Sequence, residues 1–215
     1  MVPEKIERTV VYVDGFNLYF GMLAANLVDC KWLNIRSLVM GLLKPNQRLE
    51  DIKYFTSAVT KNPNKQKRQN AYIEALETVG IKVIYGRYQS YPVECRKCGD
   101  IRTEQNEKMT DVNIATHIIT DAFQDKYDVA ILISGDSDLV PPIKAVHELF
   151  GKLKRVTVFF PPNRYNASVA FVARGSMVIG KKKLRDSQFA EEVKKPNGFI
   201  LKLPTEWPSP SPAGS

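Results

Sequence analysis

The stretch VAILISGDSD, residues 129–138, runs through five consecutive apolar residues and then stops at a serine, a glycine and two aspartates. A short continuous apolar run bounded by turn-forming residues is typical of a strand that is buried on both faces of a parallel sheet. In an open parallel α/β sheet, functional groups gather outside the carboxyl ends of the strands. The stretch therefore predicts a central strand and places the carboxylates of Asp136 and Asp138 where such a sheet binds its ligands.

Strands and helices alternate on both sides of this stretch. Short segments rich in β-branched or aromatic residues predict further strands at 9–13, 52–58, 81–85 and 155–160. Helical spacing of apolar residues, with caps at Asn34 and Thr110 and glycines at two ends, predicts helices at 35–42, 66–80, 111–123 and 139–151. The alternation predicts a three-layer, Rossmann-like α/β domain with a mainly parallel sheet.

Length and composition favour one ordinary globular domain. The chain has 215 residues, of which 44% are hydrophobic, enough to bury a full core. Charges precede a short apolar run at the N-terminus, unlike a signal peptide, and no stretch approaches the roughly 18 apolar residues that span a bilayer. We expect a cytoplasmic protein without a membrane partner, and the sequence leaves a homo-oligomer open.

Two segments interrupt the alternation. Residues 86–107 form a long polar insertion, for which a hairpin and a lid are both reasonable predictions. The insertion contains Cys95 and Cys98, half of a zinc knuckle; because zinc takes four ligands, the alternatives are a reduced structural pair and a site completed between two chains. From Pro204 to Ser215 the chain is rich in proline and serine, which predicts a flexible tail.

The net charge of +8 is distributed unevenly. Residues 151–202 contain 12 Lys and Arg against 3 Asp and Glu, a local balance of +9. One basic patch consists of Lys181, Lys182 and Lys183, and the other consists of Lys61, Lys65, Lys67 and Arg68. Clustered basic residues are the usual footprint of phosphate-backbone binding, although solvated surface is the ordinary alternative for either patch alone.

Acidic residues gather at the predicted strand ends. Asp14 follows the strand at 9–13, Asp136 and Asp138 follow the strand at 129–134, and Asp111 lies in the first turn of a helix. Carboxylates brought together repel one another, and Mg²⁺ or Mn²⁺ relieves that repulsion. Turn and capping roles are the alternatives for Asp14 and Asp136, and a helix-dipole role is the alternative for Asp111.

Three segments carry a resemblance to a known family. VYVDGFNLYFG (11–21), EKMTDVNIATHIITDAF (107–123) and YDVAILISGDSDLVPPIKAV (127–146) resemble the signature segments of the NYN domain family, the LabA-like branch of the PIN-like nuclease fold. The resemblance implies an NYN domain over residues 9–180 and a Mg²⁺- or Mn²⁺-dependent ribonuclease activity. The excess of basic residues beyond it makes 181–203 a basic C-terminal extension. The family's acidic positions are matched by Asp14, Asp111, Asp136 and Asp138.

The resemblance and the site chemistry together suggest roles for these residues. Asp14, Asp111 and Asp136 would hold the metal. Asp138 would complete the shell or orient the attacking water, and Asn17 would contact the scissile phosphate or a metal-bound water, or else satisfy local backbone. Ser134 and Ser137 could donate to a phosphate oxygen, with a plain turn role as the alternative.

RNA is the expected partner. Lys108 and the two basic patches would neutralise its backbone. The alternative is a regulatory module that binds RNA or a nucleotide without cutting it, because a fold does not determine a function.

Overall fold

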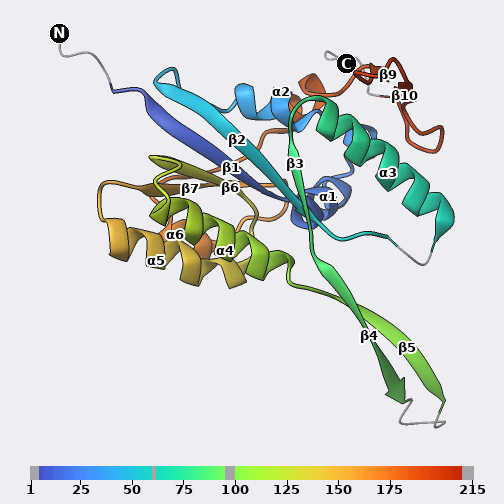
Figure 1. Ribbon diagram of the computed structural model, residues 1–215, viewed down its shortest axis with the longest axis horizontal. Coiled ribbons are helices and arrows are strands. Elements are labelled where there is room, and N and C mark those ends of the chain that lie inside the picture. The colour runs from blue at the N-terminus through green and yellow to red at the C-terminus, as the bar shows by residue number, and fades with distance from the viewer. Residues whose placement is uncertain (1–4, 60–61, 95–99, 210–215) are drawn as a thin grey trace.

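The computed structural model describes residues 5–59, 62–94 and 100–209, and for 87–94 and 101–108 it describes the backbone alone. Its centre is a six-stranded, fully parallel sheet with the order β3-β2-β1-β6-β7-β8 (Figure 1). The strands of this sheet are β1 (Glu7–Asp14), β2 (Gln47–Thr56), β3 (Lys82–Tyr85), β6 (Val129–Ile133), β7 (Arg155–Phe160) and β8 (Ser176–Val178). The predicted α/β architecture is confirmed, and VAILI is one of its two central strands.

Helices cover both faces of the sheet (Figure 1). Side chains alternate along a strand, so Val11 and Val13 of β1 pack in one core with α1, α2, α3 and α7, whereas Val10 and Tyr12 pack in the other core with α4, α5 and α6. The helices are α1 (Gly15–Ala24), α2 (Ile35–Met40), α3 (Pro63–Thr78), α4 (Thr110–Phe123), α5 (Val140–Phe150), α6 (Ala167–Val172) and α7 (Lys181–Asp186), with 3₁₀ turns η1 (Val28–Cys30) and η2 (Ser137–Leu139). No helix in the described part of the chain is long and apolar enough to cross a membrane.

The predicted helices are present, with one correction at a cap. The side chain of Asn34 caps α2 by accepting from the backbone N–H of Ser37 at 3.1 Å, and α3 ends before Gly80, whose φ is +77°. The prediction that Thr110 caps α4 is wrong. The helix begins at Thr110, and the cap position belongs to Met109, with a left-handed φ of 83° and no side-chain cap bond. The backbone turns at Met109, so Thr110 is already helical where a cap residue would be extended.

The insertion at 86–107 forms an antiparallel hairpin of β4 (Arg87–Glu94) and β5 (Ile101–Lys108). The hairpin projects away from the body of the domain (Figure 1). Of the two predicted forms, the backbone adopts the hairpin. Cys95 and Cys98 lie outside the described residues, so the choice between a thiol pair and a zinc site stays a prediction.

The basic C-terminal segment packs against the domain. It contains α7 and an antiparallel ribbon of β9 (Glu192–Lys194) and β10 (Ile200–Lys202), and its Leu184 and Leu201 belong to the core that includes α1 and α3. In the tail that the sequence predicts from Pro204, the ring of Trp207 lies 6.2 Å from that of Trp32 and 6.1 Å from that of Tyr72, centroid to centroid. Residues 210–215 are outside the described part.

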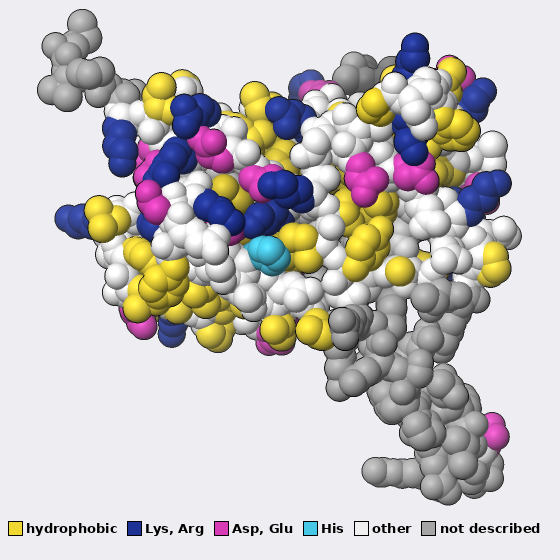
Figure 2. Space-filling view, viewed as in Figure 1, with side chains coloured by type: hydrophobic (Ala, Val, Ile, Leu, Met, Phe, Trp, Pro, Cys, Tyr) yellow, Lys and Arg dark blue, Asp and Glu magenta, His cyan; other side chains and the backbone are white. Residues whose placement is uncertain are grey.

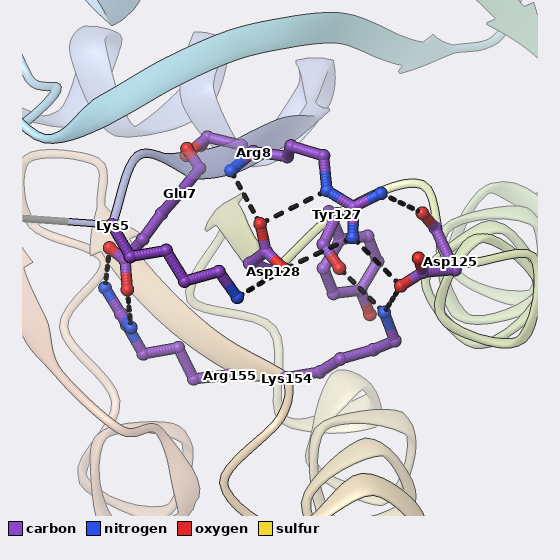
Figure 3. Close-up of polar contacts among 9 residues, drawn as sticks. Lys5, Glu7, Arg8, Asp125, Tyr127, Asp128, Lys154 and Arg155 are labelled. Atoms are coloured by element: carbon purple, nitrogen blue, oxygen red, sulfur yellow. Dashed lines mark hydrogen bonds and ion pairs between the residues drawn. The ribbon is translucent and has the colours of Figure 1, made fainter.

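An ion-pair network holds the amino ends of the central strands together (Figure 3). Asp128 accepts from the backbone N–H of Arg8 at 2.8 Å, and Asp125 accepts from the Arg8 guanidinium at 2.9 Å and from Lys154 at 2.6 Å. Basic and acidic side chains accordingly alternate on this part of the surface (Figure 2). The network joins the starts of β1, β6 and β7 at the edge of the sheet opposite to their carboxyl ends.

Candidate active site

The strand order reverses between β1 and β6. From β1 the chain passes outward to β2 and β3, and it then returns to the other side of β1 to build β6, β7 and β8. At such a switch point the connections leave the sheet in opposite directions and open a crevice at the carboxyl ends of the two strands. Asp14 ends β1, and Ser134 follows the last residue of β6 at this crevice.

A cavity of about 200 Å³ opens at the switch point. It is lined by acidic, aromatic, polar and basic side chains: Asp14, Phe16, Asn17, Phe20, Thr110, Asp111, Asp136 and Arg164. The structure thus brings Asn17 together with three of the four predicted acids, from the end of β1, the start of α4 and the turn after β6. Asp138 is exposed and does not belong to the lining.

Hydrogen bonds tie the two strand ends to each other. Asp14 caps α1 by accepting from the backbone N–H of Asn17 at 3.0 Å, and its other oxygen accepts from the Ser134 hydroxyl at 2.8 Å. The Ser134 hydroxyl accepts in turn from the backbone N–H of Asp136 at 3.1 Å, and the side-chain oxygen of Asn17 accepts from Gly135 at 3.0 Å. Asp14, Asn17 and Ser134 therefore fix the geometry of the crevice, and Asp14 and Asn17 also line the cavity.

The two aspartates of the opening stretch have different surroundings. Asp136 caps η2, and one of its carboxylate oxygens accepts from the backbone N–H of Asp138 at 2.9 Å. Asp136 therefore has the predicted capping role and also lines the cavity. Asp138 contacts Asp136 through its backbone, and Ser137 is exposed in the same turn.

Burial and neighbouring charges make ionisation of Asp14 costly. Its side chain is buried, and this burial raises the pKa of the carboxyl group to about 6, against the hydrogen bonds from Asn17 and Ser134, which lower it. The negative charges of Asp111 and Asp136 raise the pKa further. Within the described residues no three acidic, His or Cys side chains form a group close enough to hold one metal ion by themselves.

Arg164 is the site residue that the sequence interpretation missed. It lies four residues beyond the last residue of β7 and lines the cavity, and its Nε atom is buried without a hydrogen-bond partner in the described structure. The sequence did contain an indication, because Arg164 follows the carboxyl end of a predicted parallel strand, as Asp14 and Asp136 do. The loop approaches so closely that a Cβ on Gly135 would lie 1.8 Å from the Arg164 carbonyl oxygen, so a glycine is required there.

Those predicted nucleic-acid contacts whose side chains the structure describes lie outside this cavity. On α3, Lys65 and Lys67 are exposed, while Arg68 pairs with Glu206 at 2.7 Å. On α7, the three lysines are exposed; Lys182 pairs with Asp186 at 2.9 Å and Lys183 donates to the carbonyl of Gly41. Lys61 lies outside the described residues, and Lys108 ends β5, where only the backbone is described.

The sequence profile of the NYN domain matches residues 8–175, which is most of the chain. The chain belongs to the NYN domain family. This membership confirms the family assignment made from the three motifs. The domain that contains the cavity therefore belongs to a PIN-like nuclease family, whose members typically use metal ions.

Two individual proteins that resemble this chain share a quarter or less of its aligned residues. A protein named 6-hydroxy-3-succinoylpyridine 3-monooxygenase HspA, from Pseudomonas putida (strain DSM 28022 / S16), is 25% identical over an alignment of 176 residues, and the match covers 65% of this chain and 55% of that protein. The chain thus spans about half the length of this relative. The crystal structure of VPA0982, a protein of unknown function from Vibrio parahaemolyticus RIMD 2210633, is similar with a TM-score of 0.56 and 21% identity, covering 84% of this chain and 97% of that one. This second similarity supports the fold alone.

Proposed function

We propose that this NYN domain is a metal-dependent ribonuclease that hydrolyses RNA phosphodiester bonds at the acidic cavity. The observation that carries the proposal is the convergence of Asp14, Asp111 and Asp136 on one cavity at the switch point of the sheet. Three separate elements supply these acids, and two of the acids raise the pKa of the third. A carboxylate whose pKa is raised beside two further acids in a cleft is a common mark of a functional site.

The residues of the cavity fit Mg²⁺ or Mn²⁺. Asp14, Asp111 and Asp136 would hold the ion, since carboxylate oxygens are the ligands that these hard cations prefer. A closed cage of three carboxylates is unnecessary, because Mg²⁺ keeps several waters and usually takes one or two carboxylates together with substrate phosphates. When bound, the cation supplies water activation and charge neutralisation for phosphodiester hydrolysis.

The remaining residues of the cavity have chemistry suited to a phosphate. The Nδ2 group of Asn17 and the guanidinium of Arg164 are donors that would bind its oxygens, and Arg can do so with two parallel hydrogen bonds. Asp138 would act on Asp136 through its backbone N–H. Lys108 and the two basic patches would neutralise the RNA backbone further from the reaction.

A module that binds RNA or a nucleotide without cutting it is the alternative. Three acids around a phosphate site weaken simple binding, because they repel the ligand, and this argues for catalysis. The monooxygenase relative is matched over only part of its length, so its activity does not carry over to this chain; its pyridine substrate remains worth including among candidate ligands.

The test is cleavage of RNA and DNA oligonucleotides in Mg²⁺, Mn²⁺ or EDTA, with Asp136→Asn purified identically as the control for contaminating nucleases. We expect wild-type protein to cut RNA with Mn²⁺ or Mg²⁺ and to stop in EDTA, and we expect Asp136→Asn to bind RNA without cutting it. RNA binding by the wild type with no cleavage under any metal would favour the binding module. Equal cleavage by the wild type and Asp136→Asn would refute the proposal.

A further inference from the structure

A second cavity, of about 550 Å³, adjoins the acidic one. It lies between α1, the carboxyl end of β2, α3 and the C-terminal segment, and Phe16 and Phe20 line both cavities. These two rings stack on each other along α1, with centroids 6.2 Å apart and planes inclined by 18°. The two cavities therefore adjoin along this aromatic pair.

The walls of the second cavity are aromatic. Besides Phe16 and Phe20, they include Tyr19, Tyr54, Tyr72 and Trp207. Tyr72 is held in place by a hydrogen bond from its hydroxyl to the carbonyl of Leu33 at 2.9 Å and by an edge-to-face contact with the Trp207 ring. Flat aromatic surfaces of this kind favour a planar ring, because stacking on them requires little of the ligand beyond a π face.

The lining is also positively charged. Among the described residues, three cationic side chains, Lys31, Lys65 and Arg68, line the cavity against one acid, Glu206. Arg68 is mostly buried, with 20% of its side chain exposed, and the more exposed carboxylate of Glu206 binds its guanidinium at 2.7 Å. Glu206 belongs to the C-terminal segment, and its carboxylate occupies the place on Arg68 that an anionic ligand would take.

We propose that this cavity binds a nucleotide, with the base among the aromatic rings and a phosphate replacing Glu206 on Arg68. The proposal rests on the proposed function in one respect: because the two cavities share Phe16 and Phe20, the nucleotide is the one that flanks the cleaved bond. The chemistry that the cavity recognises is a planar heteroaromatic ring with a negative charge, which a nucleotide and a small heteroaromatic carboxylate both possess.

The test is isothermal titration of the full chain with AMP, UMP, inorganic phosphate and nicotinate, in EDTA so that metal binding does not contribute. We expect both nucleotides to bind more tightly than phosphate or nicotinate.

Glu206→Gln, an exposed substitution, should tighten nucleotide binding by about two- to fivefold, because Arg68 is then free of its competing carboxylate. Trp207→Ala should weaken it about tenfold, because the base would have one stacking surface fewer. Glu192→Gln, which removes an exposed ion pair with Lys202 at 3.1 Å in the same segment, is the matched control and should leave binding unchanged.

Absence of nucleotide binding by the folded wild type, or weaker binding by Glu206→Gln, would overturn the proposal. Tighter binding of nicotinate than of either nucleotide would overturn the nucleotide assignment and make the cavity a site for a small heteroaromatic acid. Because the titration needs neither metal nor cleavage, it separates the two claims. Nucleotide binding without RNA cleavage would count against the nuclease, and cleavage without nucleotide binding would count against this cavity.

Discussion

Asp14 lies where the fold needs a hydrogen-bond acceptor and where a negative charge is costly. Its two carboxylate oxygens accept from Asn17 and Ser134, so the side chain links α1 to the end of β6. Asparagine can replace it with similar shape and is as good a helix cap. The substitution keeps the cap that accepts from Asn17 and removes the charge together with one hydrogen bond, because the amide nitrogen of asparagine cannot accept from the Ser134 hydroxyl.

We predict that Asp14→Asn removes a pH-dependent loss of stability. Burial raises the pKa of Asp14 from 3.8 to about 6, so the folded state binds more protons than the unfolded state between these values. The free energy of unfolding of the wild type should therefore fall as the pH rises from about 4 to about 6, by up to about 3 kcal/mol. Urea unfolding in EDTA across this range should show the fall in the wild type and a smaller one in Asp14→Asn. Parallel profiles for the two proteins would refute the prediction.

Gly135 allows the Arg164 loop to reach the cavity. We predict that Gly135→Ala lowers the free energy of unfolding by about 1–3 kcal/mol or more, because the new Cβ would lie 1.8 Å from the Arg164 carbonyl oxygen. Gly175→Ala is the matched control, since its nearest neighbouring atom would be an ordinary 3.6 Å away, on Thr157. Urea unfolding of both variants measures the difference. A Gly135→Ala protein as stable as the control would show that the loop can move away without cost.

Among the secondary-structure elements, α7 has both a structural role and a proposed electrostatic one. All three lysines of α7 are exposed, and Lys183 also ties α7 to the C-cap of α2 by donating to the carbonyl of Gly41. Contacts to phosphates carry little base information, so they add affinity without sequence preference.

We predict that replacing Lys181, Lys182 and Lys183 together by Gln weakens RNA binding for every sequence tested and reduces the dependence of affinity on salt. For each phosphate that a lysine no longer neutralises, the slope of log K against log salt should become shallower by about 0.7 for single strands. Filter binding at several salt concentrations measures the slope, with Lys5→Gln/Lys152→Gln as the control for a general reduction of charge. An unchanged affinity in the triple variant would make this patch solvated surface.

Other contacts between elements were beyond sequence interpretation. Lys53 on β2 and Asp121 on α4 form a buried ion pair, and the Tyr12 hydroxyl donates to Asp121 at 2.8 Å. In the sequence both charges look like ordinary surface residues, because nothing local indicates that each will satisfy the other. The Thr110 cap was mispredicted for a related reason: the backbone turn at Met109 has no marker such as glycine.

Across the full chain, the sequence predicted five of the six strands of the parallel sheet and the acids at two strand ends, because these follow from local patterns, whereas the short exposed strand β8 (Ser176–Val178) was not predicted. Apolar runs such as VAILI identify buried strands, and Asp14 and Asp136 directly follow such runs. The second cavity could not be predicted, since it depends on Glu206 and Trp207 packing against α3 across a long stretch of sequence. Asp111 lies beside Asp14 and Asp136 because of the fold, and no local pattern indicates this position. The proposed nuclease function depends more on this position than on any other feature.

The most direct test of the account is the Mn²⁺-dependent rate of RNA cleavage by Asp111→Asn. If Asp111 only favours the start of α4, the variant should melt at a lower temperature and its folded fraction should cut RNA at the wild-type rate. If Asp111 helps to hold a metal ion, the rate of cleavage should instead fall by about a hundredfold or more with little change in the melting temperature, because the metal site has lost one carboxylate. Asp138→Asn, at an acid outside the cavity lining, is the matched control and should keep activity within about tenfold of the wild type. Cleavage by folded Asp111→Asn at the wild-type rate would contradict the account.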